Sequence, residues 1–219
     1  MGVVYLVRHG QASFGSADYD QLSELGVRQS HVVGDELRRR GAGSGEAWCG
    51  TFARQRGTAQ AAGFSPQHDI RWDEYDVHDV LAGHGIAADG TGADPRSFQR
   101  GLDSALARWV EAGASSPCQE SWAAFAARTR SALGELVASL GQGEDAVVFT
   151  SGGVIGALAA LALSGGAEPD WGRVFLPLHR VVCNTGITKL IVGRSGVSMV
   201  SFNEHAHLEG ESSGLLTYR

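Results

Sequence analysis

An arginine, a histidine and a glycine follow one another at Arg8, His9 and Gly10, directly after the apolar stretch Gly2–Val7. These residue types suit phosphate chemistry, because a guanidinium binds two phosphoryl oxygens at once and a neutral imidazole nitrogen can attack phosphorus. The charge of Arg8 is expected to lower the pKa of His9 and keep the imidazole unprotonated. Alone, the tripeptide is more typical of polar residues that leave a strand toward the surface. It predicts a covalent phosphohistidine only if other segments agree with it.

A second polar cluster, Thr150-Ser151-Gly152-Gly153, follows the apolar run Asp145–Thr150. Both apolar runs lack polar alternation, which is typical of strands that are buried on both faces. Open α/β sheets bind ligands beyond the carboxyl ends of their strands. We therefore expect the two clusters to face one pocket, where the amides of Gly152 and Gly153 at a helix start help to cradle an anion.

The order of the remaining patterns predicts an α/β fold with a mostly parallel central sheet and helices on both faces. Ser23 is expected to cap a helix that runs to Arg40, with Gly41 after it. Residues 186–192 and 197–202 are predicted to form an antiparallel hairpin at a sheet edge. Residues 94–112 and 120–140 read as helices, and a partly helical insertion around residues 75–118 is expected to cap the active site.

Composition narrows the class of protein. The chain has 219 residues, of which 43% are hydrophobic and 19% charged, so we expect one globular domain over residues 1–219. A net charge of −6 argues against nucleic-acid binding, although a local pocket for one anion stays possible. The longest apolar run, Val154–Leu163, is far shorter than the roughly 20 residues of a membrane helix.

The start of the chain and its cysteines favour a cytoplasmic protein. Residues 1–7 have no basic start and do not resemble a signal peptide. Three widely spaced cysteines, Cys49, Cys118 and Cys183, form neither a disulfide framework nor a zinc pattern. No histidine stands in a metal-ligand spacing, so the expected cofactor is none, and the expected partner is a small phosphorylated substrate.

Several segments together resemble the histidine phosphatase superfamily, which includes the cofactor-dependent phosphoglycerate mutases. Arg8-His9-Gly10 after a strand is followed by Leu22-Ser-Glu-Leu-Gly26 and Gln29 at the start of a helix. The resemblance implies that Arg54, within residues 51–59, is a second phosphate clamp, with Thr58 and Ala59 opening the next helix. It also implies that Glu74 is the general acid. Further matches are Glu120, Ser121, Arg128, residues 184–186 and residues 207–208.

The chain departs from this family where the second strand ends. The family carries Ser-His-Gly-Gly there, whereas this chain has Thr150-Ser151-Gly152-Gly153, so Ser151 takes the place of the second histidine. A serine can still donate one hydrogen bond. Losing a charged donor to the transition state costs on the order of 100-fold to 1000-fold in rate, which predicts slow catalysis. Ala12 and Gly15 also replace a hydroxyl residue and an asparagine, for which Ser13 or Ser16 are candidate substitutes.

These observations predict a metal-independent phosphomonoesterase in which His9 attacks, Arg8 and Arg54 bind the phosphoryl group, and Glu74 protonates the leaving oxygen. Two alternatives stay open: a mutase that returns the phosphoryl group to a second hydroxyl, and a phosphate-binding module that has lost its chemistry. Ser151 favours the binding module, whereas His9 and Glu74 oppose it. Two of these residues also have purely structural alternatives: Arg54 as an exposed cation on a helix, and Glu74 as part of a solvated acidic loop.

Overall fold

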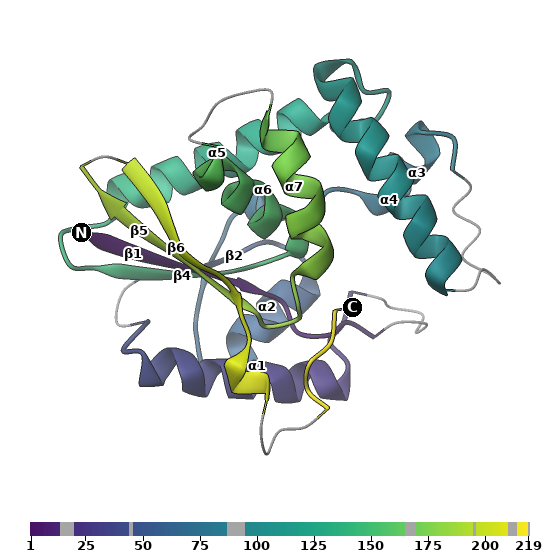
Figure 1. The fold of residues 1–219 in the computed structure, drawn as a ribbon. Helices are drawn as coiled ribbons and strands as arrows, with labels where there is room; N and C mark the ends of the chain where they lie inside the picture. Colours follow the sequence, from purple (N-terminus) through teal and green to yellow (C-terminus); the bar gives the residue numbers. More distant parts are fainter. Residues whose placement is uncertain are drawn as a thin grey trace.

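The structure is a computed structural model of the whole chain (Figure 1). It describes residues 1–13, 20–43, 46–86, 95–164, 170–194, 196–209 and 214–218, with the backbone alone at 95, 96 and 170. Gly15 and Ser16, which the sequence singled out in the loop after His9, lie outside these ranges, as does Asp94 at the expected start of a helix.

Six strands form one mixed sheet in the order β3-β2-β4-β1-β5-β6. The pairs β1–β4, β4–β2 and β2–β3 are parallel, whereas β5 is antiparallel to both β1 and β6. The sheet is therefore mostly parallel, as predicted, and the expected hairpin is confirmed, with β6 at the edge. The strands are β1 Gly2–Arg8, β2 Glu46–Cys49, β3 Gln67–His68, β4 Asp145–Thr150, β5 Ile187–Gly193 and β6 Gly196–Glu204.

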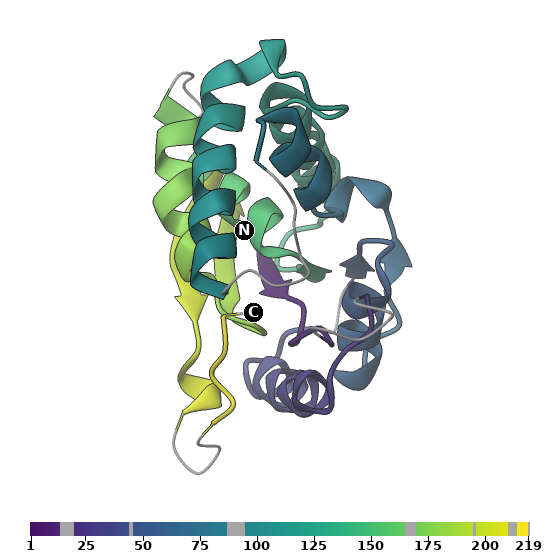
Figure 2. The same cartoon turned by 90° about the vertical axis from the view of Figure 1, so that its right-hand side faces the viewer.

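Helices cover both faces of this sheet, so the predicted fold class is confirmed. Figure 1 shows α1 and α2 on one face and α5, α6 and α7 on the other. The helix α4 runs beside α7, as the teal and green helices in Figure 2 show. The helices within the described residues are α1 Glu24–Arg39, α2 Ala53–Ala61, α3 Val77–Gly83, α4 Pro95–Ala112, α5 Trp122–Ser139, α6 Gly152–Leu163 and α7 Asp170–Val181, with 3-10 turns at Ile70–Trp72, Gly113–Ser115 and Ala206–Leu208.

The central strands are apolar throughout because each of their faces packs against helices. In β1, Val4 and Leu6 belong to the larger core on the side of α5 and α6. Tyr5 and Val7 point the other way, into the smaller core beneath α1 and α2. Strands buried on both faces carry such continuous apolar runs rather than an alternation.

The register of β1 and β4 places the two polar clusters level with each other. Arg8 pairs with Thr150, and the next backbone amide, that of His9, donates to the Thr150 carbonyl at 2.8 Å. His9 and Ser151 therefore leave the sheet at the same edge. That the two strand ends line one pocket stays a prediction.

Two helix starts test the predicted capping. Ser23 caps α1 as expected, since its Oγ accepts from the Gly26 amide at 3.0 Å. The prediction that Thr58 and Ala59 open the second helix is wrong, because α2 begins at Ala53. The earlier start is stabilised by Gln55, whose Oε1 accepts from the Phe52 amide at 3.2 Å.

The middle of the chain contains α3, α4 and the turn Gly113–Ser115, which agrees with a partly helical insertion. Its role as a cap over the active site stays a prediction. The helix α7 was not expected from the sequence. Pro177 lies inside it, and an internal proline removes a backbone donor and argues against a continuous helix.

Candidate active site

His9 lies directly after β1 and is 7% exposed. Its Nδ1 is 2.8 Å from the Gly10 carbonyl oxygen, which can only accept, so Nδ1 carries the proton. Nε2 then holds a lone pair, and the Nε of Arg54 donates to it at 3.2 Å. Two further bonds fix the backbone, from Asn184 Nδ2 to the His9 carbonyl at 3.1 Å and from the Gly10 amide to Thr58 Oγ1 at 2.9 Å.

The electrostatics keep this imidazole neutral. Burial is the largest cause that holds the pKa of His9 well below its usual value, followed by the charges of Arg54 and Arg8. The sequence had pointed to Arg8 for this effect, whereas Arg8 is the smallest of the three causes. A neutral imidazole with an unprotonated Nε2 is the form that can act as a nucleophile.

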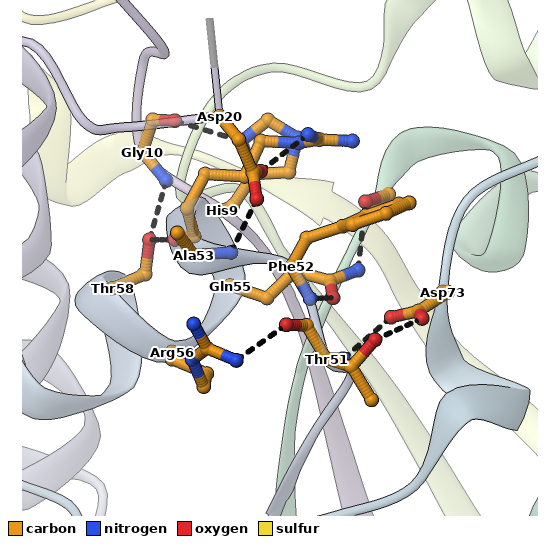
Figure 3. A network of polar contacts seen from close by, with 12 residues as sticks. His9, Gly10, Asp20, Thr51, Phe52, Ala53, Gln55, Arg56, Thr58 and Asp73 are labelled. Atoms are coloured by element: carbon orange, nitrogen blue, oxygen red, sulfur yellow. Dashed lines mark hydrogen bonds and ion pairs between the residues drawn. The ribbon is translucent and has the colours of Figure 1, made fainter. Parts of the chain in front are cut away.

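Arg54 comes from the first turn of α2, and its side chain is only 13% exposed, so it is not a solvated helix cation. Its guanidinium carbon lies 4.3 Å from the centroid of the Phe52 ring. Its Nη1 pairs with the Asp20 carboxylate at 2.6 Å, and the same carboxylate accepts from the Ala53 amide at 2.7 Å. Figure 3 shows Asp20 beside His9 and Ala53.

Arg8 is held by carbonyl groups of two later segments of the chain. Its Nη1 donates to the carbonyl of Val182, after α7, and to that of Tyr218 at 2.8 Å. Its guanidinium also lies beside the start of α6, since a β-carbon at Gly152 would be 3.6 Å from Arg8 Nε. The predicted cation and the predicted anion-binding amides are thus neighbours.

Glu74 projects onto the same helix start. Its Oε2 accepts from the Gly153 amide at 2.8 Å, and its Oε1 from the Tyr75 amide at 3.3 Å. Burial raises the pKa of Glu74, against the opposing effects of the Gly153 bond and of the charges of Arg54 and Arg8. A carboxyl group with a raised pKa can hold a proton for a leaving group.

The loop that carries Glu74 is braced from α5. Arg128 Nη1 donates to the carbonyls of Arg71 at 2.9 Å and Asp73 at 2.7 Å. Arg128 Nε is in turn held by the Glu120 carboxylate at 2.6 Å. Glu120 and Arg128, which belong to a segment that resembles the family, therefore hold in place the loop that carries Glu74.

Ser151 is fully buried between β4 and α6. Its Oγ accepts from Gln55 Nε2 at 2.9 Å, and the same amide group donates to the Trp72 carbonyl at 3.1 Å. Gln55 is itself fully buried. The Ser151 hydroxyl is thus covered by Gln55, and it reaches a phosphoryl oxygen only if that amide moves aside.

The structure brings the six predicted site residues into one neighbourhood. His9 contacts Arg54, Arg8 lies beside Gly152, and Glu74 is bonded to the residue after Gly152. Sequence reasoning missed Asp20 and Gln55. Gln55 looks like an ordinary helix residue, and the only signal for Asp20 was its place in the loop that leads from His9 to the first helix.

A metal ion has no prepared site among the residues that the structure describes, where no group of three or more histidines, cysteines or acids could hold one. Four histidines outside the predicted site instead contact protein oxygens: His84 with Ser116, His179 with Tyr75, His205 with Asn203 and His207 with Thr185.

The family model of the histidine phosphatase superfamily (branch 1) matches residues 4–205. The chain belongs to this superfamily, as the motifs had indicated. No curated protein matches it in sequence.

Solved structures share the fold at low sequence identity. A mycobacterial glucosyl-3-phosphoglycerate phosphatase in complex with inorganic phosphate is 23% identical, with a TM-score of 0.65 over 94% of this chain and 99% of that one. An open reading frame product from Mycobacterium tuberculosis is 16% identical, with a TM-score of 0.67 over 92% and 97%. A phosphoserine phosphatase variant from Entamoeba histolytica, bound to phosphoserine, is 18% identical, with a TM-score of 0.58 over 95% and 100%.

Of the helices that the structure describes, none combines the length and the apolar character that a membrane span requires.

Proposed function

We propose that the chain is a phosphomonoesterase that acts on a small phosphorylated substrate through a phosphohistidine at His9. The observation that carries this proposal is the state of His9: a buried imidazole with its proton on Nδ1 and its Nε2 lone pair beside the Arg54 guanidinium. Membership of the histidine phosphatase superfamily supports the same reading.

In the first step, His9 Nε2 attacks phosphorus, so that a P–N bond forms as the ester P–O bond breaks. Arg54 and Arg8 bind the phosphoryl oxygens, with the Gly152 amide as a further donor, and the Ser151 hydroxyl joins them once the Gln55 amide has moved aside. Glu74 gives its proton to the leaving oxygen, a role that its raised pKa favours.

In the second step, water attacks the phosphohistidine and the P–N bond breaks. Glu74, now a carboxylate, takes a proton from this water, which returns the enzyme to its starting state. The reaction needs no metal, because the two arginines supply the positive charge. The free thiols of Cys49, Cys118 and Cys183 support a reducing, cytoplasmic setting.

The substrates named for two structural neighbours, phosphoserine and glucosyl-3-phosphoglycerate, are both phosphomonoesters. They support this class of substrate without selecting one compound. A mutase would have to retain the phosphoryl group on His9 until a second hydroxyl arrives, and Ser151 in place of a charged donor weakens that retention.

The remaining candidate is a module that binds phosphate without turnover. The observation in its favour concerns Ser151, which stands in the place of the second histidine and is buried beneath Gln55. The raised pKa of Glu74 opposes it, because a clamp that only binds an anion has no use for a proton donor.

A phosphate-release screen over phosphorylated sugars, nucleotides and amino acids tests the proposal. The wild-type protein is compared with His9→Ala and with the control His205→Ala, which removes an imidazole that bonds to the Asn203 carbonyl away from the site. We expect release by the wild type and the control but not by His9→Ala. Equal release by all three proteins would contradict the mechanism.

A further inference from the structure

An acidic side chain, Asp20, lies inside the proposed phosphate clamp. It belongs to the loop that joins β1 to α1, and it binds two groups of α2. Its Oδ1 accepts from Arg54 Nη1 at 2.6 Å and its Oδ2 from the Ala53 amide at 2.7 Å. The Asp20 side chain is 34% exposed, so solvent reaches it. A carboxylate in this place is unexpected, since it repels the phosphate that the site is proposed to bind.

The contacts of Asp20 decide which edge of the guanidinium faces the nucleophile. An arginine binds two oxygens with parallel N–H bonds, and the edge formed by Nε and Nη2 offers such a pair. Asp20 takes Nη1, and Nε points at His9 Nε2 at 3.2 Å. Within the part of the chain that the structure describes, Nη2 has no hydrogen-bond partner. The forked edge is therefore presented on the His9 side.

The charge of Asp20 has a second consequence. It offsets one of the two positive charges that attract a phosphoryl group. Unit charges a few ångströms apart in a partly buried site interact strongly enough to change binding by about tenfold or more. Inorganic phosphate, the second product, is an anion of similar charge to the phosphoryl group of the monoester, and the same offset weakens its binding.

We propose that Asp20 is a positioning residue of the clamp: it fixes the Nε and Nη2 edge of Arg54 toward His9, and it weakens the hold of the clamp on free phosphate. This inference rests on the proposed function. According to this inference, Asp20 lowers the affinity of the site for phosphate, so that the product dissociates readily. At the same time, Asp20 keeps Arg54 in a fixed orientation.

Binding of inorganic phosphate, measured by titration calorimetry, tests the charge effect without any need for turnover. We expect Asp20→Asn to lower the Kd for phosphate about tenfold, whereas Asp20→Glu, which keeps the carboxylate, stays within about twofold of the wild type. The control is Asp35→Asn, which breaks an exposed pair with Arg38 on α1 and should leave the Kd unchanged. If Asp20→Asn does not fold, Asp20→Ser is measured in the same way.

Kinetics test the positioning effect. Asp20→Ala releases Arg54 and should lower kcat and KM together, by about tenfold each, because alignment is lost while phosphate attraction increases. Asp20→Asn keeps one acceptor for Arg54 Nη1, so its kcat should fall less. A general loss of structure would instead lower kcat and raise KM.

The outcomes separate the two proposals. No binding of phosphate by the wild type overturns the proposed function and this inference with it. Binding by the wild type with an equal Kd in Asp20→Asn, or in Asp20→Ser where that is the variant measured, overturns the inference alone.

Discussion

Replacing Ser151 with histidine would restore the residue that the family carries at this position. The structure predicts that Ser151→His alone does not raise kcat. Ser151 has no exposed surface, and the fully buried Gln55 lies directly against its hydroxyl. An imidazole is much larger than a hydroxymethyl group, and Gln55 occupies the space that it would need.

The cost of this substitution follows from its burial. Overpacking a dense interior typically lowers the free energy of unfolding by about 1 to 3 kcal/mol. For a chain of this size, each kcal/mol moves Tm by roughly 2 to 4 °C, so Ser151→His should melt roughly 2 to 12 °C below the wild type. The Ser151 hydroxyl is also lost as an acceptor for Gln55 Nε2, which still bonds to the Trp72 carbonyl.

A second substitution makes the prediction sharper. Gln55→Ala removes an amide-bearing chain of about the size that the histidine adds. The Trp72 carbonyl keeps a donor in this variant, because Thr150 Oγ1 also bonds to it at 2.5 Å. The Phe52 amide loses its acceptor, at a cost of about 1 kcal/mol. We expect the double variant, Gln55→Ala with Ser151→His, to recover most of the lost Tm.

Thermal unfolding and steady-state kinetics on the four proteins, the wild type, each single variant and the double variant, measure this coupling. In the double variant, kcat should exceed the wild-type value by about tenfold, a cautious part of what one charged donor contributes to a transition state. The reasoning is refuted if Ser151→His is as stable as the wild type and the double variant gains nothing. Gln55 would then not fill the place of the second histidine.

Three further predictions concern protons and metal ions. Because Glu74 must be protonated to act as an acid, wild-type activity should fall as the pH rises through its raised pKa. Glu74→Gln should lose this alkaline fall in activity, and its kcat should be lower by about 100-fold or more. If Glu74→Gln kept the same alkaline fall, that result would argue against the role of Glu74 as the acid. Burial and the charge of Arg8 lower the pKa of His179 to about 4, below the ordinary 6.5 of an unfolded chain. The free energy of unfolding should therefore decrease as the pH falls from about 6.5 to about 4, by up to about 3 kcal/mol. Denaturant unfolding of His179→Gln should show a smaller decrease over the same pH range. Equal decreases in the two proteins would mean that His179 is not the group responsible. Chelators should leave turnover unchanged, and a strict need for an added divalent ion would contradict the metal-free mechanism.

The sequence predicted the sheet and the position of His9 at its edge because both depend on local patterns. Two apolar runs without alternation specify buried strands, and the residues after them must leave the sheet at its carboxyl edge. The register that sets Arg8 opposite Thr150 agrees with this reasoning. Ser23 caps its helix for an equally local reason, since a serine oxygen accepts from an amide in the first turn.

Local sequence patterns do not predict contacts between distant segments of the chain. Gln55 meets Ser151 only because α2 and β4 pack together, and nothing in either segment specifies that pair. The bond between Asp20 and Arg54 likewise depends on Asp20 lying beside the start of α2, which neither segment specifies. The helix α7 was missed because Pro177 interrupts its pattern, although packing and its other residues keep the helix intact.

The proposed mechanism requires a covalent bond between phosphorus and His9, and trapping that bond tests it. The enzyme is mixed with a substrate from the release screen and quenched in base, because phosphohistidine is labile in acid. Peptides are then analysed by mass spectrometry. The mechanism predicts one phosphoryl group on the peptide that contains His9 and none in His9→Ala. An enzyme that turns over substrate with no phosphoryl group on His9, or with one on another residue, would contradict it.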